Sequence, residues 1–167
     1  MKKVPGIVTL TEFGDYECPH CRMAYPVIKK LQKEFGSRLK FEFKNFPIVE
    51  AHPMALMAAE AAEAARAQGK FDEMHDALFE NQPNLGEYLI VTLAKKIGLD
   101  MKKFSDELTN HTYMPMIKKD LDEAMRKDVA GTPTFFVDGQ LFEAEWSYGN
   151  LAKAIKGDSS GTKEILY

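Results

Sequence analysis

The chain has 167 residues, enough for one domain with a substantial core, and its 45% hydrophobic and 28% charged residues are typical of a globular protein. Its 22 lysine and arginine residues against 25 aspartate and glutamate residues give a formal charge of -3 at pH 7, without a basic stripe that would contact a nucleic-acid backbone. No apolar run in the sequence is long enough to span a bilayer. We therefore expect neither a nucleic-acid partner nor insertion into a membrane.

The N-terminal segment MKKVPGIVTL has a small positive start, but Pro5 and Gly6 follow at once, so it lacks the apolar core of a signal peptide. As the chain is given, we expect a cytoplasmic protein. If a leader has been removed, a periplasmic or other extracytoplasmic location is expected instead.

Residues 7–46 predict a strand, a helix and a second strand. Residues 7–13 (IVTLTEF) are rich in β-branched and apolar side chains, as strands are. A helix is expected to begin at Pro19, which the first helical turn tolerates, and to end at Gly36. Residues 39–46 (LKFEFKNF) alternate apolar and charged side chains, which indicates the second strand. The three elements form a βαβ unit.

The next segment is helical almost throughout. Its apolar residues recur at helical spacing, which predicts helices over 53–67, 71–79, 89–97, 100–108 and 113–125. After these helices, the sequence indicates a strand at 134–137, a turn at Asp138-Gly139, a return strand at 140–143 and a helix capped by Ser147.

We therefore expect one domain of the α/β class. Residues 1–46 form its N-terminal part, which holds the βαβ unit. Residues 47–129 form a helical insertion, and residues 130–157 form the C-terminal part with the hairpin and the last helix. Residues 158–167 are expected to be a flexible tail.

Both cysteines of the chain, Cys18 and Cys21, lie in the stretch GDYECPHCR. A zinc site needs about four ligands, and the histidines form no second paired cluster. These histidines are His20, His52, His75 and His111. A structural disulfide across so short a loop would remove little entropy from the unfolded chain. Thiol redox chemistry is therefore the favoured interpretation, and we interpret the last three histidines as structural or solvent-facing.

The expected helix start distinguishes the two thiols. Cys18 precedes the helix that begins at Pro19, where unpaired backbone N–H groups and the helix dipole favour a thiolate, so we predict that Cys18 is the nucleophile. Cys21, one turn further on the same face, can attack a mixed disulfide on Cys18 and release the partner. His20 lies between them and can donate to the Cys18 sulfur. A more stable thiolate makes the disulfide a stronger oxidant.

Three stretches in the same order carry a resemblance to a known family. They are GDYECPHC, FKNFPIVEAHPMALMAAEAAEAA and GTPTFFVDG, and with the CPHC motif they make the chain resemble the DsbA-like thiol-disulfide oxidoreductases of the thioredoxin superfamily over roughly residues 7–155. The resemblance implies a thioredoxin fold with a helical insertion, unfolded or extended protein thiols as substrates, and no metal, nucleotide or flavin cofactor. In such systems a quinone-linked membrane protein often reoxidises the enzyme.

The resemblance also implies a role for Glu12, six positions before Cys18. These proteins carry a buried acid there, proposed to help proton transfer to or from the inner thiol. The strand pattern places Val8, Leu10 and Glu12 on one face, which predicts a raised pKa for the Glu12 carboxyl. If Glu12 instead lies at a strand end, it reaches solvent.

Thr132-Pro133 matches the position of the cis-proline that packs beside the dithiol in this family. The backbone of Thr132 would then be free to pair with an extended substrate strand. Many strongly oxidising members have Val before this proline, so Thr132 leaves the redox poise open. Three alternatives remain: a cytoplasmic reductase or isomerase, a non-redox glutathione-dependent isomerase or transferase, which usually lacks the second cysteine, and a client-binding chaperone module.

Overall fold

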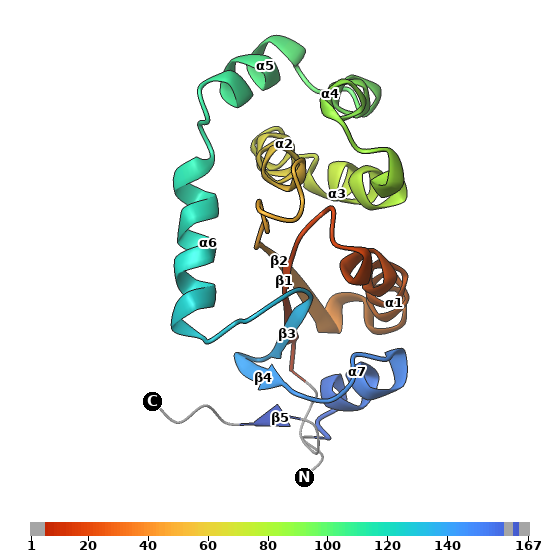
Figure 1. The fold of residues 1–167 in the computed structure, drawn as a ribbon. Helices are drawn as coiled ribbons and strands as arrows, with labels where there is room; N and C mark the ends of the chain where they lie inside the picture. The colour runs from red at the N-terminus through yellow and green to blue at the C-terminus, as the bar shows by residue number, and fades with distance from the viewer. Residues whose placement is uncertain (1–5, 159–161, 164–167) are drawn as a thin grey trace.

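A five-stranded sheet forms the centre of the computed structural model, which describes residues 6–158 and 162–163 (Figure 1). Its strand order is β2-β1-β3-β4-β5; β1 runs parallel to β2, and the other neighbouring strands are antiparallel. The strands are β1 (Val8–Gly14), β2 (Leu39–Asn45), β3 (Thr134–Val137), β4 (Gln140–Phe142) and β5 (Thr162–Lys163). The parallel pair brings Gly14 opposite Asn45, so both strands end at the same edge of the sheet.

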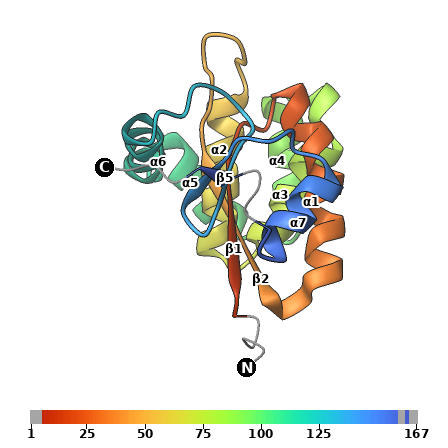
Figure 2. The ribbon, with the colours of Figure 1, turned by 90° about the horizontal axis from the view of Figure 1, so that it is seen from below.

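Helices cover both faces of the sheet and one end of it. On one face lie α1 (Pro19–Phe35) and α7 (Tyr148–Ile155), and α6 (Met114–Arg126) lies on the other (Figures 1 and 2). The remaining helices lie on the β2 side of the sheet (Figure 1). They are α2 (Ala55–Ala67), α3 (Phe71–Glu80), α4 (Glu87–Lys96) and α5 (Met101–Thr109), with 3-10 turns at Gly36–Arg38 and Gln82–Asn84.

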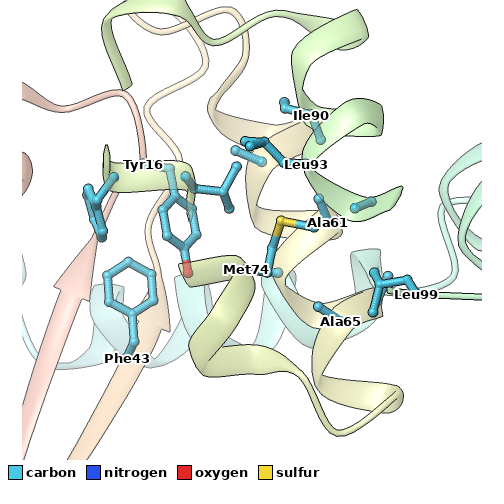
Figure 3. Packing of buried hydrophobic residues seen from close by; sticks show 14 of the residues in the cluster. Tyr16, Phe43, Ala61, Ala65, Met74, Ile90, Leu93 and Leu99 are labelled. Atoms are coloured by element: carbon cyan, nitrogen blue, oxygen red, sulfur yellow. The ribbon is translucent and has the colours of Figure 1, made fainter. Parts of the chain in front are cut away.

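Two large hydrophobic clusters hold these layers together. The first, here called the sheet cluster, fills the space between the sheet and helices α1 and α7; its buried residues are Leu10, Ala24, Ile28, Leu31, Phe35, Leu39, Phe135, Val137, Phe142, Leu151, Ala152, Ala154 and Ile155. The second, here called the insertion cluster, joins the end of the sheet to α2–α5 (Figure 3). It contains Tyr16, Cys18, Cys21, Phe43, Ala58, Ala61, Ala62, Ala64, Ala65, Met74, Leu78, Phe79, Ile90, Leu93, Ala94, Leu99 and Phe104.

The alanine-rich sequence of α2 suits its central place in the helical layer. It contacts α3, α4, α5 and α6, and its small side chains let these neighbours approach closely. Because Cys18 and Cys21 belong to the insertion cluster, the dithiol packs against this helical layer as well as against α1.

Several element bounds differ from the sequence predictions. The helix predicted from Pro53 begins at Ala55, because Glu17 accepts the hydrogen bond of the Met54 N–H at 2.5 Å and residues before it form turns. On α6 only Ile117 and Ala124 of the predicted apolar stripe are buried, since a narrow strip of this helix meets the sheet.

The predicted hairpin is present, and part of the segment predicted as a tail forms a strand. Asp138 and Gly139 both adopt positive φ angles, 48° and 81°, and join β3 to β4 as the dipeptide predicts. Within the segment expected to be a tail, Thr162–Lys163 pairs with β4 as β5. Residues 159–161 and 164–167 of that segment lie outside the described residues.

Candidate active site

The turn between β1 and α1 places Cys18 at the N-terminus of α1. Cys18 is the N-cap residue in an extended conformation, with Pro19 in the first helical turn, as the sequence predicts. Cys18 is 5% exposed and Cys21 is fully buried, and both are free thiols. One sulfur thus lies at the surface of the helix end and the other beneath it.

The surroundings of Cys18 favour its thiolate. Its pKa is lowered to about 5, chiefly by a hydrogen bond from the Cys21 thiol, while partial burial acts in the opposite direction. The Thr132 side chain and the backbone N–H groups of Cys21 and His20 lower this pKa further. The contribution of these N–H groups is the expected effect of a helix N-terminus on a sulfur placed there.

The surroundings of Cys21 favour its thiol. Burial raises the pKa of Cys21 far above its ordinary value, and the hydrogen bond to Cys18 and the charge of Glu12 raise it further. The backbone N–H of Asp15, whose nitrogen lies 3.5 Å from Cys21 Sγ, opposes this shift. The dithiol therefore holds one thiolate and one proton at neutral pH.

Glu12 lies beneath the dithiol as a buried acid. It is 2% exposed, and its Oε1 has no hydrogen-bond partner among the described residues. Burial, and then the charge of Cys18, raise its pKa to about 8, so the predicted shift is confirmed and the solvent-exposed alternative is wrong. Gly14 permits this packing, because a Cβ there would lie 2.4 Å from the Phe43 ring and 3.1 Å from Glu12 Oε1.

The loop before β3 completes the site on the other side of Cys18. The Thr132-Pro133 peptide bond is cis, as the resemblance implies. Cys18 Sγ lies 3.5 Å from the Thr132 carbonyl oxygen. A groove of about 470 Å³ runs along this loop, and Leu141 and Trp146 line its other wall. The Cys18 sulfur and the groove thus meet at one residue, Thr132.

Comparisons with known proteins identify the family of this chain. The family model described as "Thioredoxin" matches residues 6–157. The crystal structure of oxidised BdbD from Bacillus subtilis is 28% identical, with a TM-score of 0.81 over 95% of this chain and 91% of that one. The thiol-disulfide exchange protein alpha-DsbA2 from Wolbachia pipientis is 25% identical, with a TM-score of 0.79 over 92% of this chain and 83% of that one. This chain belongs to the DsbA-like thiol-disulfide oxidoreductases. Its thioredoxin fold with inserted helices is thereby confirmed.

Curated relatives match through a small part of their length. The Na(+)/H(+) antiporter NhaA 1 of Salinispora arenicola (strain CNS-205) is 36% identical over 156 residues, which are 93% of this DsbA-like chain and 24% of the antiporter. The Na(+)/H(+) antiporter NhaA of Herminiimonas arsenicoxydans is 30% identical over 156 residues, 93% of this chain and 25% of that protein. The chain thus spans about a quarter of the length of the curated relatives it matches.

The histidine of the CPHC motif acts on Cys18 through its backbone. In this DsbA-like site the backbone N–H of His20 acts on the Cys18 sulfur, while its ring is exposed. A role for the ring stays a prediction.

Sequence reasoning missed Gln82, which connects the insertion to the DsbA-like dithiol. Its Nε2 donates hydrogen bonds to the carbonyl oxygens of Tyr16 at 2.8 Å and Cys18 at 2.9 Å. A glutamine that binds backbone groups leaves no motif in a sequence, so no signal could have identified it.

Within residues 6–158 and 162–163, no group of three or more His, Cys, Asp and Glu side chains could hold a metal ion. In the same ranges, each helix is too short or too polar to cross a membrane.

Proposed function

We propose that this chain donates disulfides to unfolded or extended protein thiols through the Cys18–Cys21 pair. The observation that carries the proposal is the position of Cys18 at the N-terminus of α1, next to the fully buried Cys21. There the hydrogen bond from Cys21 lowers the pKa of Cys18 to about 5, and burial holds the pKa of Cys21 far above its ordinary value. A stabilised thiolate favours the reduced dithiol, and the corresponding disulfide is therefore readily passed to a client.

In the first step, a client thiolate attacks Cys18 Sγ of the oxidised enzyme and breaks the bond to Cys21. Cys18 is the target because it is the less buried sulfur and lies beside the groove. Cys21 leaves with the electron pair and takes up a proton. Glu12, whose pKa is about 8, holds a proton at neutral pH and lies within electrostatic reach of both sulfurs.

In the second step, another client thiolate attacks the client sulfur of the mixed disulfide. The bond to Cys18 breaks, and Cys18 leaves as the thiolate that its surroundings favour. The client gains a disulfide and the enzyme gains two electrons. Substrate attachment in the groove, with the backbone of Thr132 pairing to an extended segment, orients the client sulfur toward Cys18.

The reduced enzyme then needs an oxidant. A quinone-linked membrane protein is the reoxidant implied by the resemblance, and an oxidising, extracytoplasmic compartment is the location in which a disulfide donor would work. Both are part of the proposal.

The decisive experiment is the equilibrium of the dithiol with a glutathione buffer, read by mass spectrometry after alkylation. We expect a potential clearly above that of thioredoxin, about −270 mV. A potential at or below that value would overturn the donor role and favour the reductase alternative. A reduced client with two cysteines, oxidised by the wild type and not by Cys18→Ser, completes the test.

A further inference from the structure

A second pair of ionisable side chains lies next to the dithiol. His52 is in the loop 46–54 between β2 and α2, and its Nδ1 lies 2.7 Å from Oδ2 of Asp15. The Asp15 side chain is 0% exposed, and that of His52 is 21% exposed. A carboxylate buried to this degree needs strong partners, and His52 is one of them.

Asp15 also contacts both cysteines through its backbone. Its carbonyl oxygen accepts a hydrogen bond from the Cys18 N–H at 3.1 Å, and its own nitrogen lies 3.5 Å from Cys21 Sγ. Its carboxylate accepts a further hydrogen bond from the Ile48 N–H at 2.8 Å. Asp15 is therefore fixed between the loop 46–54 and the dithiol.

The charged groups that face His52 all come from the segment between β1 and α1. They are Asp15, Glu17 and the Cys18 thiolate, and each can carry a negative charge. The hydrogen bond to Asp15 raises the pKa of His52, partial burial opposes this, and the charges of Cys18 and Glu17 add to the increase. The negative charge on Cys18 exists in the reduced enzyme and disappears when the disulfide forms.

We propose that His52 is a positioning residue, whose imidazolium, held by Asp15, stabilises the Cys18 thiolate and binds its own proton more tightly when the disulfide is reduced. The inference rests on the proposed function, because it concerns the same dithiol. Two client thiols give up two electrons and two protons as they form one disulfide. The electrons break the Cys18–Cys21 bond, one proton goes to Cys21, and the other goes to solvent, apart from the fraction that His52 takes up as its pKa rises. Cys18 remains a thiolate because its own pKa is low.

The test compares His52→Asn with a matched control. Asparagine keeps a donor for Asp15 and removes the titratable charge. His111→Asn is the control, because His111 Nδ1 makes the same kind of contact with Glu60 Oε1 at 2.8 Å in the turn after α5. The readout is the equilibrium constant with glutathione, at about pH 6 and about pH 9.5.

We expect His52→Asn to make the disulfide less oxidising by about two- to fivefold at the lower pH, the range of partly exposed charge pairs. The two proteins should agree at the higher pH, where the wild-type imidazole has lost its proton. His111→Asn should match the wild type at both values. An equal change at both pH values, or no change at either, would overturn the proposal, since a purely structural contact is independent of pH.

The coupling between His52 and the dithiol can also be measured in the wild-type protein, without any variant. By linkage, the pKa of His52 must fall on oxidation by the same factor by which its charge favours the thiolate. Ring titrations by NMR in both redox states measure this, and identical His52 curves would refute the coupling. A low potential of the Cys18–Cys21 disulfide in the glutathione buffer would overturn the donor role and leave the coupling between His52 and Cys18 untouched. The failure of the proposed function and the failure of this inference are therefore distinguishable.

Discussion

The two large hydrophobic clusters of this protein differ in what they contain besides apolar side chains. The sheet cluster consists of aliphatic and aromatic residues such as Leu10, Ile28 and Leu151. The insertion cluster contains both cysteines, and Tyr16 within it shares a buried hydrogen bond of 2.9 Å with His75.

Buried polar residues follow the same division. Seven polar or charged residues are buried in the described part of the chain, and all lie on β1, β2, α2, α3 or the turn after β1: Thr11, Glu12, Asp15, Asn45, Glu60, Glu63 and His75. In the same described part, none lies on α1, α7, β3 or β4. Because buried polar groups are costly unless paired, their concentration marks the end of the sheet as the chemical side and the sheet cluster as the stabilising side.

Removing one sulfur from the insertion cluster gives the largest expected effect. Cys21→Ser cannot form the internal disulfide and should lose turnover. When it meets a client that contains a disulfide, its Cys18 thiolate should attack that disulfide and form a mixed disulfide, which accumulates because the resolving thiol is missing. Non-reducing gels measure the adducts, and Cys18→Ser should show none. A Cys21→Ser protein without adducts to any disulfide-containing client would contradict the role given to Cys21.

Two substitutions that each create a cavity, one in each cluster, test whether only the insertion cluster affects thiol exchange. Leu151→Ala in the sheet cluster and Leu78→Ala in the insertion cluster both truncate fully buried side chains, and each should lower the free energy of unfolding by about 2–4 kcal/mol. Only Leu78→Ala should also slow thiol exchange, because it loosens the layer that contacts the dithiol. Equal thiol-exchange rates in the two folded variants would contradict this division between the two clusters.

The buried acid makes the stability of the reduced enzyme depend on pH. Folded Glu12 keeps its proton up to about pH 8, whereas the ordinary pKa is 4.5, so its contribution to the free energy of unfolding falls as pH rises through this window. Glu12→Gln removes the ionisable group and with it this decrease in the free energy of unfolding. The variant should gain about 1–3 kcal/mol relative to the wild type between about pH 5 and about pH 9, measured by urea unfolding. A constant difference across this range would show that Glu12 is ionised in the folded protein.

The same substitution tests proton transfer. Glu12→Gln should slow client oxidation about tenfold or more at neutral pH, because Cys21 loses its proton donor. The Cys18 pKa should stay near 5, since other groups set it. Stopped-flow rates across pH provide the measurement, and equal rates in both proteins would remove Glu12 from the mechanism.

The smallest effect is expected at the contact between the insertion and the dithiol turn. Gln82→Leu removes two hydrogen bonds to backbone carbonyl oxygens and should lower the free energy of unfolding by about 1–2 kcal/mol. Gln68→Leu, which removes contacts with Asp100 on the exposed side of the layer, is the control and should cost less. An equal cost would show that Gln82 matters no more than a surface contact.

Local signals in the sequence predict much of this fold. Pro19 and Gly36 mark the ends of α1, and Gly36 adopts a positive φ of 53°. The cis bond before Pro133 was predictable only through the family resemblance, because most X-Pro bonds are trans.

The contacts between distant segments were not predictable. Asp15 meets Ile48 and His52 across more than thirty positions, and Gln82 meets Cys18 across 64. Such side-chain contacts have no periodicity, and they depend on how the insertion packs against the end of the sheet. Sequence reasoning therefore found the sulfurs and missed the groups that hold them.

Trp146, the only tryptophan of the chain, lines the groove beside the cis-proline loop. Indole emission depends on the polarity around the ring and on nearby quenchers, so a client segment that enters the groove should alter it. The enzyme thus carries its own optical reporter at the place where clients are expected to bind. Association and dissociation of an unlabelled client can be followed in real time, with a signal that comes from one known position.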